Sequence, residues 1–282
     1  MRNAPRDPTL NSNQHHESPA DLSVAAQRTP QAVTPVIADV EAPDAVQLSF
    51  RVRIVRTEEH LSKAVQIRAA SYGRHHPEVA ALLQSAEEAD RAPFALVLLA
   101  ESKLDGGALG TLRIETNARG PLPIEGLLPA QSQYTGKTIA FVTRLAVRGG
   151  GQEATLVKLA LFKALHRYCL ACQIDWVVVT ARPPMDRQYV RLGFVDIYDR
   201  ETLVPIPWNE QIPMRLMALE VISCEREWRR TGHPLYAFMF VDYTPDIEIF
   251  NSVSGIWARP RTRQASLPPN AALEEILGIP LI

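Results

Sequence analysis

Three arginines stand where their neighbours in the sequence predict a buried setting. Arg68 falls on the apolar stripe of a predicted helix, Arg113 lies within an apolar strand pattern, and Thr143-Arg144 interrupts another strand. A guanidinium in an apolar setting needs a counter-charge or a ligand, and Asp90 is a candidate partner. The three arginines therefore predict a site for a carboxylate, a phosphate or an acidic cluster, with buried structural ion pairs as the alternative.

A run of three glycines, Gly149-Gly150-Gly151, follows a predicted strand and precedes a predicted helix. The first turn of a helix has free backbone N–H groups and the positive end of the helix dipole, so it binds phosphate. Arg148 would add charge there, and Gln152 extends the loop. Measured from Arg148, the six-residue phosphate-loop pattern Arg-x-x-Gly-x-Gly/Ala is imperfect, because Glu153 occupies its last position. A flexible turn is the alternative.

Cys169 and Cys172 have the spacing of a redox or metal pair, and His166 lies three residues before them. The pair falls late in a predicted helix, where the dipole does not stabilise a thiolate, and zinc would need a fourth ligand. We therefore expect packing cysteines and no metal site. His75-His76 closes the first predicted helix, either on the surface or lining the site.

The elements that must position these residues alternate between strand and helix patterns. We predict strands over 48–54, 94–100, 109–116, 138–147, 174–181, 194–198 and 235–243. We predict helices over 57–72, 154–172, 185–192 and 213–230. Helices that interrupt a largely continuous sheet predict an α/β fold with mixed strand directions.

Composition limits the class of protein. The chain has 282 residues, of which 46% are hydrophobic, a formal net charge of −1 and three cysteines. These values favour a globular protein of a reducing compartment with no general attraction to nucleic acid, and neither a signal peptide nor a membrane span is evident. We expect a cytoplasmic protein with a disordered segment over 1–47, one domain over 48–257, and a tail over 258–282 that contains a short helix.

The order of strand, glycine loop, long helix, strand, short helix and then Tyr189-Val190-Arg191-Leu192-Gly193-Phe194 resembles the GNAT acyltransferases. The resemblance implies the GNAT fold, a mixed central sheet with helices on both faces. It also implies that Tyr189 protonates the departing thiolate and that backbone N–H groups around Leu145 stabilise the oxyanion. A core tyrosine is the alternative for Tyr189.

A second resemblance is to the autoinducer synthases, which are relatives of the GNAT enzymes. It rests on Arg68 and Tyr72, on Asp90 and Arg113, and on Phe141-Val142-Thr143-Arg144, where those enzymes carry Glu-x-Ser-Arg. The overall pattern over residues 48 to 250 is closest to the long-chain N-acyl amino acid synthases of the FeeM-like group. The resemblance implies transfer of a long-chain acyl group from acyl carrier protein to the amine of an amino acid. It implies no permanently bound cofactor, with the acyl-phosphopantetheine thioester, or acyl-CoA, as co-substrate.

Two other functions fit the same sequence, and the base of the reaction is open. One is an ordinary acetyl-CoA-dependent N-acetyltransferase, and the other is a non-catalytic module that binds an acyl ligand. Arg68, Arg113 and Arg144 would hold the acceptor or organise the pocket, together with Tyr72, Asp90 and Thr143. Glu115 or a water molecule would remove the proton from the amine.

Overall fold

The computed structural model describes residues 45–73, 83–207 and 212–249, and the backbone of 262–264. These residues all belong to one of the two units of the chain, Glu41–Ile282. The other unit, Met1–Val40, lies outside the described residues, as do His75-His76 and most of the predicted C-terminal tail.

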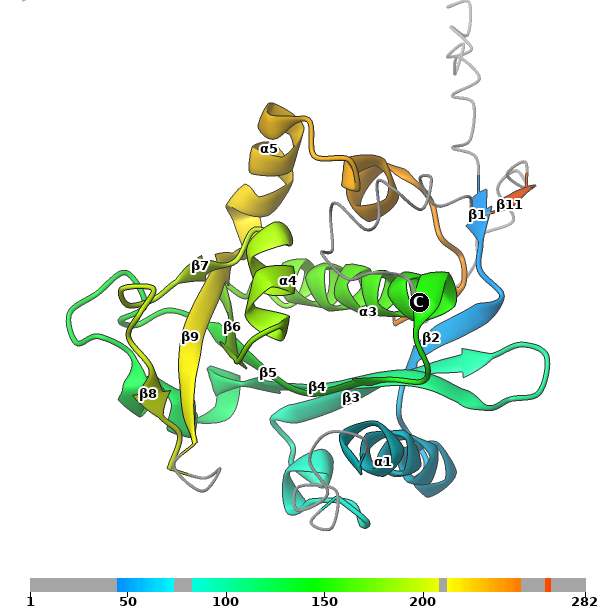
Figure 1. The fold of residues 1–282 in the computed structure, drawn as a ribbon, viewed down its shortest axis with the longest axis horizontal. Coiled ribbons are helices and arrows are strands. Elements are labelled where there is room, and N and C mark those ends of the chain that lie inside the picture. The colour runs from blue at the N-terminus through cyan, green and yellow to red at the C-terminus, as the bar shows by residue number, and fades with distance from the viewer. Residues whose placement is uncertain (1–44, 74–82, 208–211, 250–261, 265–282) are drawn as a thin grey trace, which may run out of the picture. The chain divides into compact units, whose positions relative to one another are not determined.

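A mixed sheet forms the centre of the described unit (Figure 1). Its strand order is β10-β2-β3-β4-β5-β6-β9-β7, with β8 paired to β9 beyond this path. Neighbouring strands are antiparallel except for β10 with β2 and β5 with β6, which are parallel. The bounds are β2 Phe50–Ile54, β3 Ala95–Ser102, β4 Ala108–Thr116, β5 Ile139–Val147, β6 Trp176–Ala181, β7 Val195–Asp196, β8 Val204–Pro205, β9 Pro213–Glu220 and β10 Ile247–Glu248.

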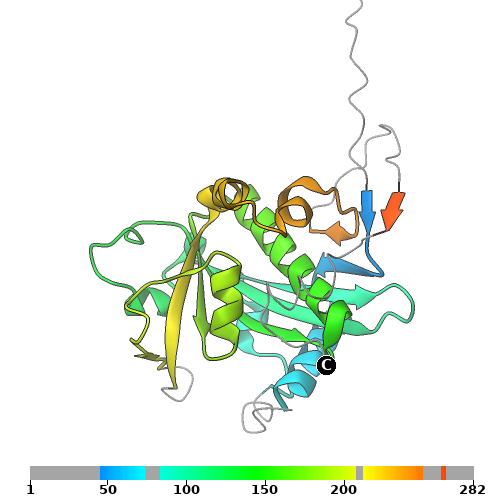
Figure 2. The same ribbon diagram turned by 45° about the horizontal axis from the view of Figure 1, so that its top comes forward.

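Helices cover both faces of this sheet, as Figures 1 and 2 show. On one face, α1 (Glu58–Gly73) packs with Leu61 and Ala64 against Val97 and Leu99 of β3. On the other face lie α3 (Gly151–Ala171), α4 (Met185–Arg191) and α5 (Val221–Thr231). The remaining helical turns are η1 Glu88–Arg91, η2 Asn117–Arg119, η3 Pro123–Leu127 and the π-helical turn η4 Ala237–Val241. None of the helices in the described ranges combines the length and apolar character that crossing a bilayer requires.

The long helix α3 lies unusually close to β4 because of a glycine. A Cβ atom placed on Gly110 would lie 2.6 Å from Cγ1 of Val157 and 3.1 Å from Cδ1 of Leu161. Both α3 residues are buried in the main core. Glycine at this position therefore lets α3 approach the sheet closely, and this contact sets the distance between α3 and β4.

The strands β5 and β6 separate halfway along their length. They pair from Ile139–Trp176 as far as Val142–Val179, yet β5 continues to Val147 and β6 continues to Ala181 against β9. The register between β4 and β5 shifts at the same level, between the pairs Arg113–Thr143 and Thr111–Ala146. Such a bulge bends a strand away from its neighbour. The result is an opening in the sheet that begins at Thr143.

Most predicted elements are confirmed. The strands at 48–54, 94–100, 109–116, 138–147 and 174–181 and the helices at 57–72 and 185–192 are present, with shifts of a few residues at their ends. The glycine run ends one strand and opens α3, three residues before the helix predicted from 154.

Two predicted elements are wrong, and one domain boundary shifts. The first eight residues of the predicted helix 213–230 form β9, because pairing with β6 and β7 overrides the helix preference of Met, Leu and Ala. The predicted strand 235–243 instead contains the turn η4, and the buried Lys163 ammonium donates to the carbonyls of Phe238 in this turn and of Asp242 directly after it. Ala45–Gln47 (β1), predicted to be disordered, pairs in parallel with Thr262–Gln264 (β11).

Candidate active site

Arg68 and Asp90 form a fully buried ion pair beneath α1. Nη1 of Arg68 donates to both carboxylate oxygens of Asp90, at 2.7 and 2.9 Å, and their side chains are 1% and 0% exposed. Asp90 also accepts the backbone N–H of Glu87 at 2.9 Å, which orders the acidic segment before β3. The Nε and Nη2 atoms of Arg68 are buried and have no hydrogen-bond partner among the described residues. Burial lowers the pKa of Arg68, while Asp90 opposes that effect.

Arg113 bonds to Glu115 on its own strand, to Thr143 of β5 and to the acidic segment before β3. Its Nε donates to Glu115 at 2.9 Å and to the Thr143 hydroxyl at 3.2 Å, and its Nη1 donates to Glu87 at 3.0 Å. Thr143 in turn donates its hydroxyl to Glu115 at 3.2 Å. Arg113 and Thr143 are partners in the β4–β5 ladder, so their side chains share a face and meet.

Arg144 lies in the bulge of β5, with a positive φ of 56° that a residue other than glycine seldom adopts. Its Nε and Nη2 donate to the two carboxylate oxygens of Glu87, at 2.6 and 2.5 Å. Burial favours the neutral forms of both groups, but the paired bonds prevail: the pKa of Arg144 is raised and that of Glu87 is lowered. The bulge therefore turns the arginine toward the acidic segment, where the pair holds it.

These side chains form one polar cluster on the α1 face, with three arginines and three acids: Arg68, Arg113, Arg144, Glu87, Asp90 and Glu115. It separates the apolar contacts of α1 with β3 from a second core around Ile139, Phe141 and Trp176. The predicted arginines and Asp90 thus come together. Glu87 escaped the sequence reasoning, although the run of acids before β3 contained the signal.

Tyr72 lies near the arginines of this cluster, and Tyr189 of the main core lies near Tyr72. Burial raises the pKa of Tyr72, which the positive charges of Arg144 and Arg68 oppose. Burial also raises the pKa of Tyr189, and the nearby Tyr72 adds to this rise. Tyr189 packs against Phe194 and Phe162, with ring centroids 5.2 and 6.0 Å apart. The tyrosine of the short helix and the aromatic residue of α1 therefore lie near one another.

The glycine turn lies at the end of β5, next to the end of α1, because Ser71 donates its hydroxyl to the carbonyl of Val147 at 3.0 Å. Gly149 and Gly151 have φ values of 71° and 76°, a region that favours glycine. No atom lies within 4 Å of a Cβ placed on any of the three glycines, and Gln152 is exposed. The guanidinium of Arg148 lies beside Gly107 in the β3–β4 turn. Hydrogen bonds from Ser102 and Gly107 lower the pKa of Asp105, and the charge of Arg148 lowers it further. Leu145 follows Arg144 in the bulge and packs on the main core.

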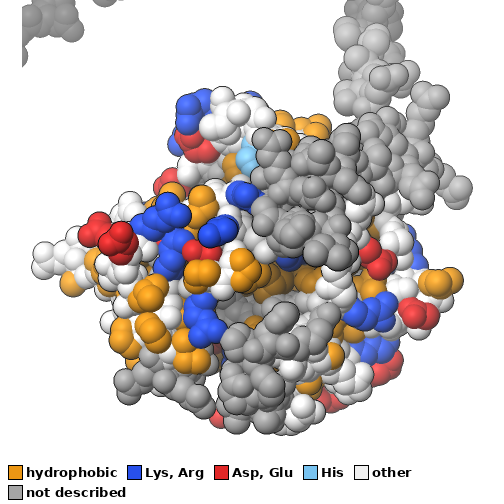
Figure 3. All heavy atoms as spheres, in the orientation of Figure 1, with side chains coloured by type: hydrophobic (Ala, Val, Ile, Leu, Met, Phe, Trp, Pro, Cys, Tyr) orange, Lys and Arg blue, Asp and Glu red, His pale blue; other side chains and the backbone are white. Residues whose placement is uncertain are grey.

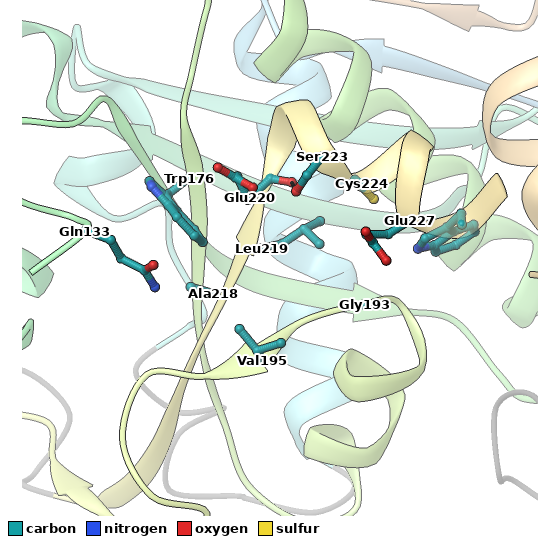
Figure 4. A pocket seen from close by; sticks show the side chains of 11 residues that line it. Gln133, Trp176, Gly193, Val195, Ala218, Leu219, Glu220, Ser223, Cys224 and Glu227 are labelled. Atoms are coloured by element: carbon teal, nitrogen blue, oxygen red, sulfur yellow. Dashed lines mark hydrogen bonds between the residues drawn. The ribbon is translucent and has the colours of Figure 1, made fainter. Parts of the chain in front are cut away.

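Two hollows elsewhere in the described structure are not lined by any predicted site residue. One, of about 290 Å³, lies between β9, β7 and α5 and is lined by Trp176, Val195, Glu227 and Trp228 among others (Figure 4). The other, of about 350 Å³, lies at the opposite ends of β4 and β5 beside Tyr168 and Cys172. Within the described ranges no three His, Cys, Asp or Glu side chains gather as metal ligands. Cys169 is buried and Cys172 is exposed.

Solved structures with a similar fold include an N-acyl amino acid synthase and acyl-homoserine lactone synthases. The N-acyl amino acid synthase FeeM from uncultured soil microbes is 19% identical, with 63% of this chain and 93% of that chain covered and a TM-score of 0.50. The CoA-dependent acyl-homoserine lactone synthase BjaI is 14% identical, with coverage of 80% and 98% and a TM-score of 0.47. The acyl-homoserine lactone synthase LasI is 18% identical, with coverage of 61% and 90% and a TM-score of 0.43. No curated protein matches the chain.

The mixed sheet, its flanking helices and the similarity to the FeeM structure define the GNAT fold. The family model described as "N-acyl amino acid synthase FeeM" matches residues 63–237, more than half of the sequence. The chain therefore belongs to the FeeM family of N-acyl amino acid synthases. It is an N-acyltransferase.

Proposed function

We propose that the protein transfers a long-chain acyl group from acyl carrier protein to the amine of an amino acid. The family to which the protein belongs is described as an N-acyl amino acid synthase, and an N-acyl amino acid is the product of this reaction. The amine attacks the thioester carbonyl, the tetrahedral oxyanion is stabilised by backbone N–H groups of the bulge around Leu145, and the thiol leaves. The acyl group remains on the amine as an amide.

The observation that supports an amino acid as the acceptor is the edge of the Arg68 guanidinium that makes no hydrogen bond. Its Nε and Nη2 point along one edge of the guanidinium and have no partner among the described residues. Arg113 and Arg144 each bind two or more acceptors of the cluster. Two parallel N–H donors match the two oxygens of a carboxylate, and buried donors without acceptors favour such a ligand. Arg68 therefore binds the acceptor's carboxylate in this proposal.

The donor side is formed by the opening between β5 and β6 and by the glycine turn at its end. A phosphopantetheine arm lies in the opening and its phosphate meets the first turn of α3. Figure 3 shows Lys and Arg side chains gathered over the face that carries α4. The basic residues of α4 and of the segment before it are Arg182, Arg187 and Arg191. The whole chain has a net charge of −1, so this local charge favours an anionic carrier such as acyl carrier protein.

The test combines product analysis with a choice of donors. Lipid extracts of a bacterium that expresses the protein should contain amino acids with amide-linked fatty acyl chains. The purified protein should form the same product from palmitoyl-acyl carrier protein faster than from palmitoyl-CoA, and should not use acetyl-CoA. Turnover of acetyl-CoA alone, or of palmitoyl-CoA in preference to the carrier protein, contradicts the proposed donor.

The acceptor site has its own matched variants. Arg68→Met removes the free guanidinium edge and should raise KM for the amino acid by ~10-fold or more, since bonds to a charged group contribute about 1.5–3 kcal/mol. Arg230→Met removes an exposed arginine of α5 and should leave KM unchanged. Equal KM values for both variants refute the carboxylate site. Esterifying the amino acid should reproduce the effect of Arg68→Met on the wild-type protein.

A further inference from the structure

Two lysines of α3 are largely withdrawn from solvent, and only one of them is fully bonded. Nζ of Lys163 lies 2.5 Å from the carbonyl oxygen of Phe238, 2.7 Å from that of Asp242 and 2.8 Å from the Thr244 hydroxyl. Each hydrogen of its ammonium group therefore has an acceptor, and the residue holds the η4 turn to α3. Lys163 needs no ligand.

Lys158, one and a half turns earlier, has a single partner. Its Nζ lies 2.6 Å from Oε1 of Gln188, a neutral amide, and it has no other hydrogen-bond partner and no ion pair among the described residues. Burial lowers the pKa of Lys158 to about 8, with no neighbouring charge to oppose the effect. A half-buried cation whose partner is neutral favours a negatively charged ligand, because an anion there replaces part of the lost hydration.

The position of Lys158 is fixed by its neighbours on two helices. Phe162, one turn further along α3, packs against Tyr189, and Gln188 precedes Tyr189 on α4. Val157, the residue before Lys158, faces Gly110 of β4. Lys158 therefore points from α3 toward α4, beside the tyrosine. Figures 1 and 2 both show these helices side by side.

The two helices follow the strand ends that border the opening in the sheet. The helix α3 begins shortly after the free end of β5, and α4 begins shortly after the free end of β6. A pantetheine arm that enters between the strand ends must pass between the first turns of both helices. Lys158 and Gln188 connect these helices, so their side chains border the path of the arm toward Tyr189.

Negative charge arises on this path when the thiol leaves. The C–S bond breaks with its electron pair on sulfur, and the thiolate needs a proton or a cation. Burial raises the pKa of the Tyr189 phenol above that of an alkyl thiol, so proton transfer from Tyr189 to the thiolate is uphill. An ammonium with a pKa of about 8 is close to that of a thiol, about 8.5 for cysteine, and transfer from it is nearly balanced.

We propose that Lys158 is a catalytic residue of the donor site, whose ammonium group pairs with the departing sulfur and gives it a proton. This inference rests on the proposed thioester chemistry. The amine nitrogen bonds to the carbonyl carbon, the intermediate collapses, and the C–S electron pair goes to sulfur. The Nζ proton moves to sulfur to give the free thiol. Lys158, left neutral, regains a proton equivalent to the one that the amine nitrogen loses. Gln188 positions Nζ by accepting one of its hydrogens.

The experiment compares two donors that differ in their need for a proton. One is an acyl-pantetheine, whose alkyl thiolate is a poor leaving group, and the other is the corresponding acyl 4-nitrothiophenyl ester, whose aryl thiolate leaves unprotonated. With Lys158→Gln, turnover of the acyl-pantetheine should fall by ~100-fold or more, the usual scale of general acid catalysis, and that of the aryl thioester should fall little. Turnover of the acyl-pantetheine by the wild type should decline above about pH 8. Turnover of the aryl thioester by Lys158→Gln should show no such decline.

Two further variants keep the result interpretable. Lys137→Gln alters a half-exposed lysine outside the site and should leave both donors unaffected. Lys158→Met removes the bond to Gln188 without a new polar group, and should show the same donor difference if its melting temperature equals that of the wild type. Equal losses with both donors, or no loss with either, overturn the role of Lys158. A wild-type protein that uses neither donor with any amine overturns the proposed function, and this inference with it.

Discussion

Glu115 lies directly opposite Phe141 in the β4–β5 ladder, and both side chains are buried on the face that α1 covers. Phe141 occupies the position where the autoinducer synthases carry the glutamate of Glu-x-Ser-Arg. Glu115 bonds instead to Arg113 and to the hydroxyl of Thr143, which stands at the serine of that pattern. The acid that is missing from β5 is thus supplied by the neighbouring strand, so the cluster keeps a carboxylate at this level of the sheet.

The first prediction tests this exchange of position. Glu115→Gln removes a charge that is bonded to Arg113, and should lower kcat/KM by about 10- to 100-fold, since such bonds contribute about 1.5–3 kcal/mol. The double variant Glu115→Leu with Phe141→Glu restores an acid on the same face and should recover part of the loss. Phe141→Leu alone controls for the lost ring. Steady-state kinetics, with melting curves of each variant, measure the recovery. No recovery in the double variant would mean that the acid must stand at position 115 itself, as a general base would.

The second prediction concerns Glu87, which holds Arg144 with both carboxylate oxygens. Arg144 has a left-handed backbone conformation, and its side chain is half-buried beside Tyr72. In Glu87→Gln the amide cannot accept two charged donors, so Arg144 should leave its position and activity should fall by ~10-fold or more. The conservative Arg144→Lys cannot form the paired bonds and should show a loss of similar size. Normal activity in both variants would restrict the pair to a structural role.

The third prediction separates stability from function at the buried pair of Arg68 and Asp90. Asp90→Asn leaves Arg68 as a buried charge without a counter-charge, which should lower the free energy of unfolding by about 3–5 kcal/mol. Adding Arg68→Met to that variant removes the unpaired charge and should restore most of the stability but none of the affinity for the amino acid. Urea titrations and KM measurements of the two variants check both parts. A double variant less stable than Asp90→Asn would contradict the electrostatic origin of the loss.

The sequence predicts this cluster only in part, and the reason lies in strand register. Arg68 and Arg113 stand out because charges rarely fall on apolar stripes, which one segment alone can reveal. The partners of Arg113 depend on which residue of β5 lies beside it, and the bulge between Thr111 and Arg113 shifts that register by one residue. Periodicity within a strand does not contain this information, so the bond between Arg113 and Thr143 and the role of Glu87 required coordinates.

The wrong helix over 213–220 has a similar cause. Met214, Leu216, Met217 and Leu219 are good helix formers, and their spacing fits a helix that continues into α5. In the structure Leu216, Met217 and Ala218 are buried on both faces of β9, where strand pairing determines the conformation. In the strand, Arg215 is buried and bonds to Asp186 and Asp196. These two carboxylates are the partners that allow a charged residue within the buried strand.

The fourth prediction tests the close approach of α3 to the sheet. Gly110→Ala places a methyl group 2.6 Å from Cγ1 of Val157, so the helix must shift and stability should fall by about 1–3 kcal/mol. Val157→Ala removes the obstructing methyl groups. The two variants together should therefore be more stable than the sum of their separate losses predicts. A double-mutant cycle by urea denaturation measures the coupling, and additive losses would show that α3 is not held by this contact.

The last prediction follows from the pKa of Lys163, which burial lowers to about 7. In the unfolded chain a lysine keeps a pKa of about 10.4, so between these values the unfolded state binds a proton that the folded state lacks. The free energy of unfolding therefore gains a contribution that rises with pH across this window. Compared with Lys163→Met, the wild type should show a steeper rise, by up to ~1.4 kcal/mol per pH unit between pH 7.5 and 9.5.

The half-exposed Lys137 is the control, since Lys137→Met should leave the slope of the wild type unchanged. Three oxygen atoms surround Nζ of Lys163, and only an ammonium group can donate a hydrogen to each of them. These bonds oppose the effect of burial. Parallel curves for wild type and Lys163→Met would mean that the bonds prevail and that Lys163 stays charged at neutral pH. A steeper wild-type curve would mean that desolvation prevails despite three acceptors, and the same argument would then apply with greater force to Lys158, which has one.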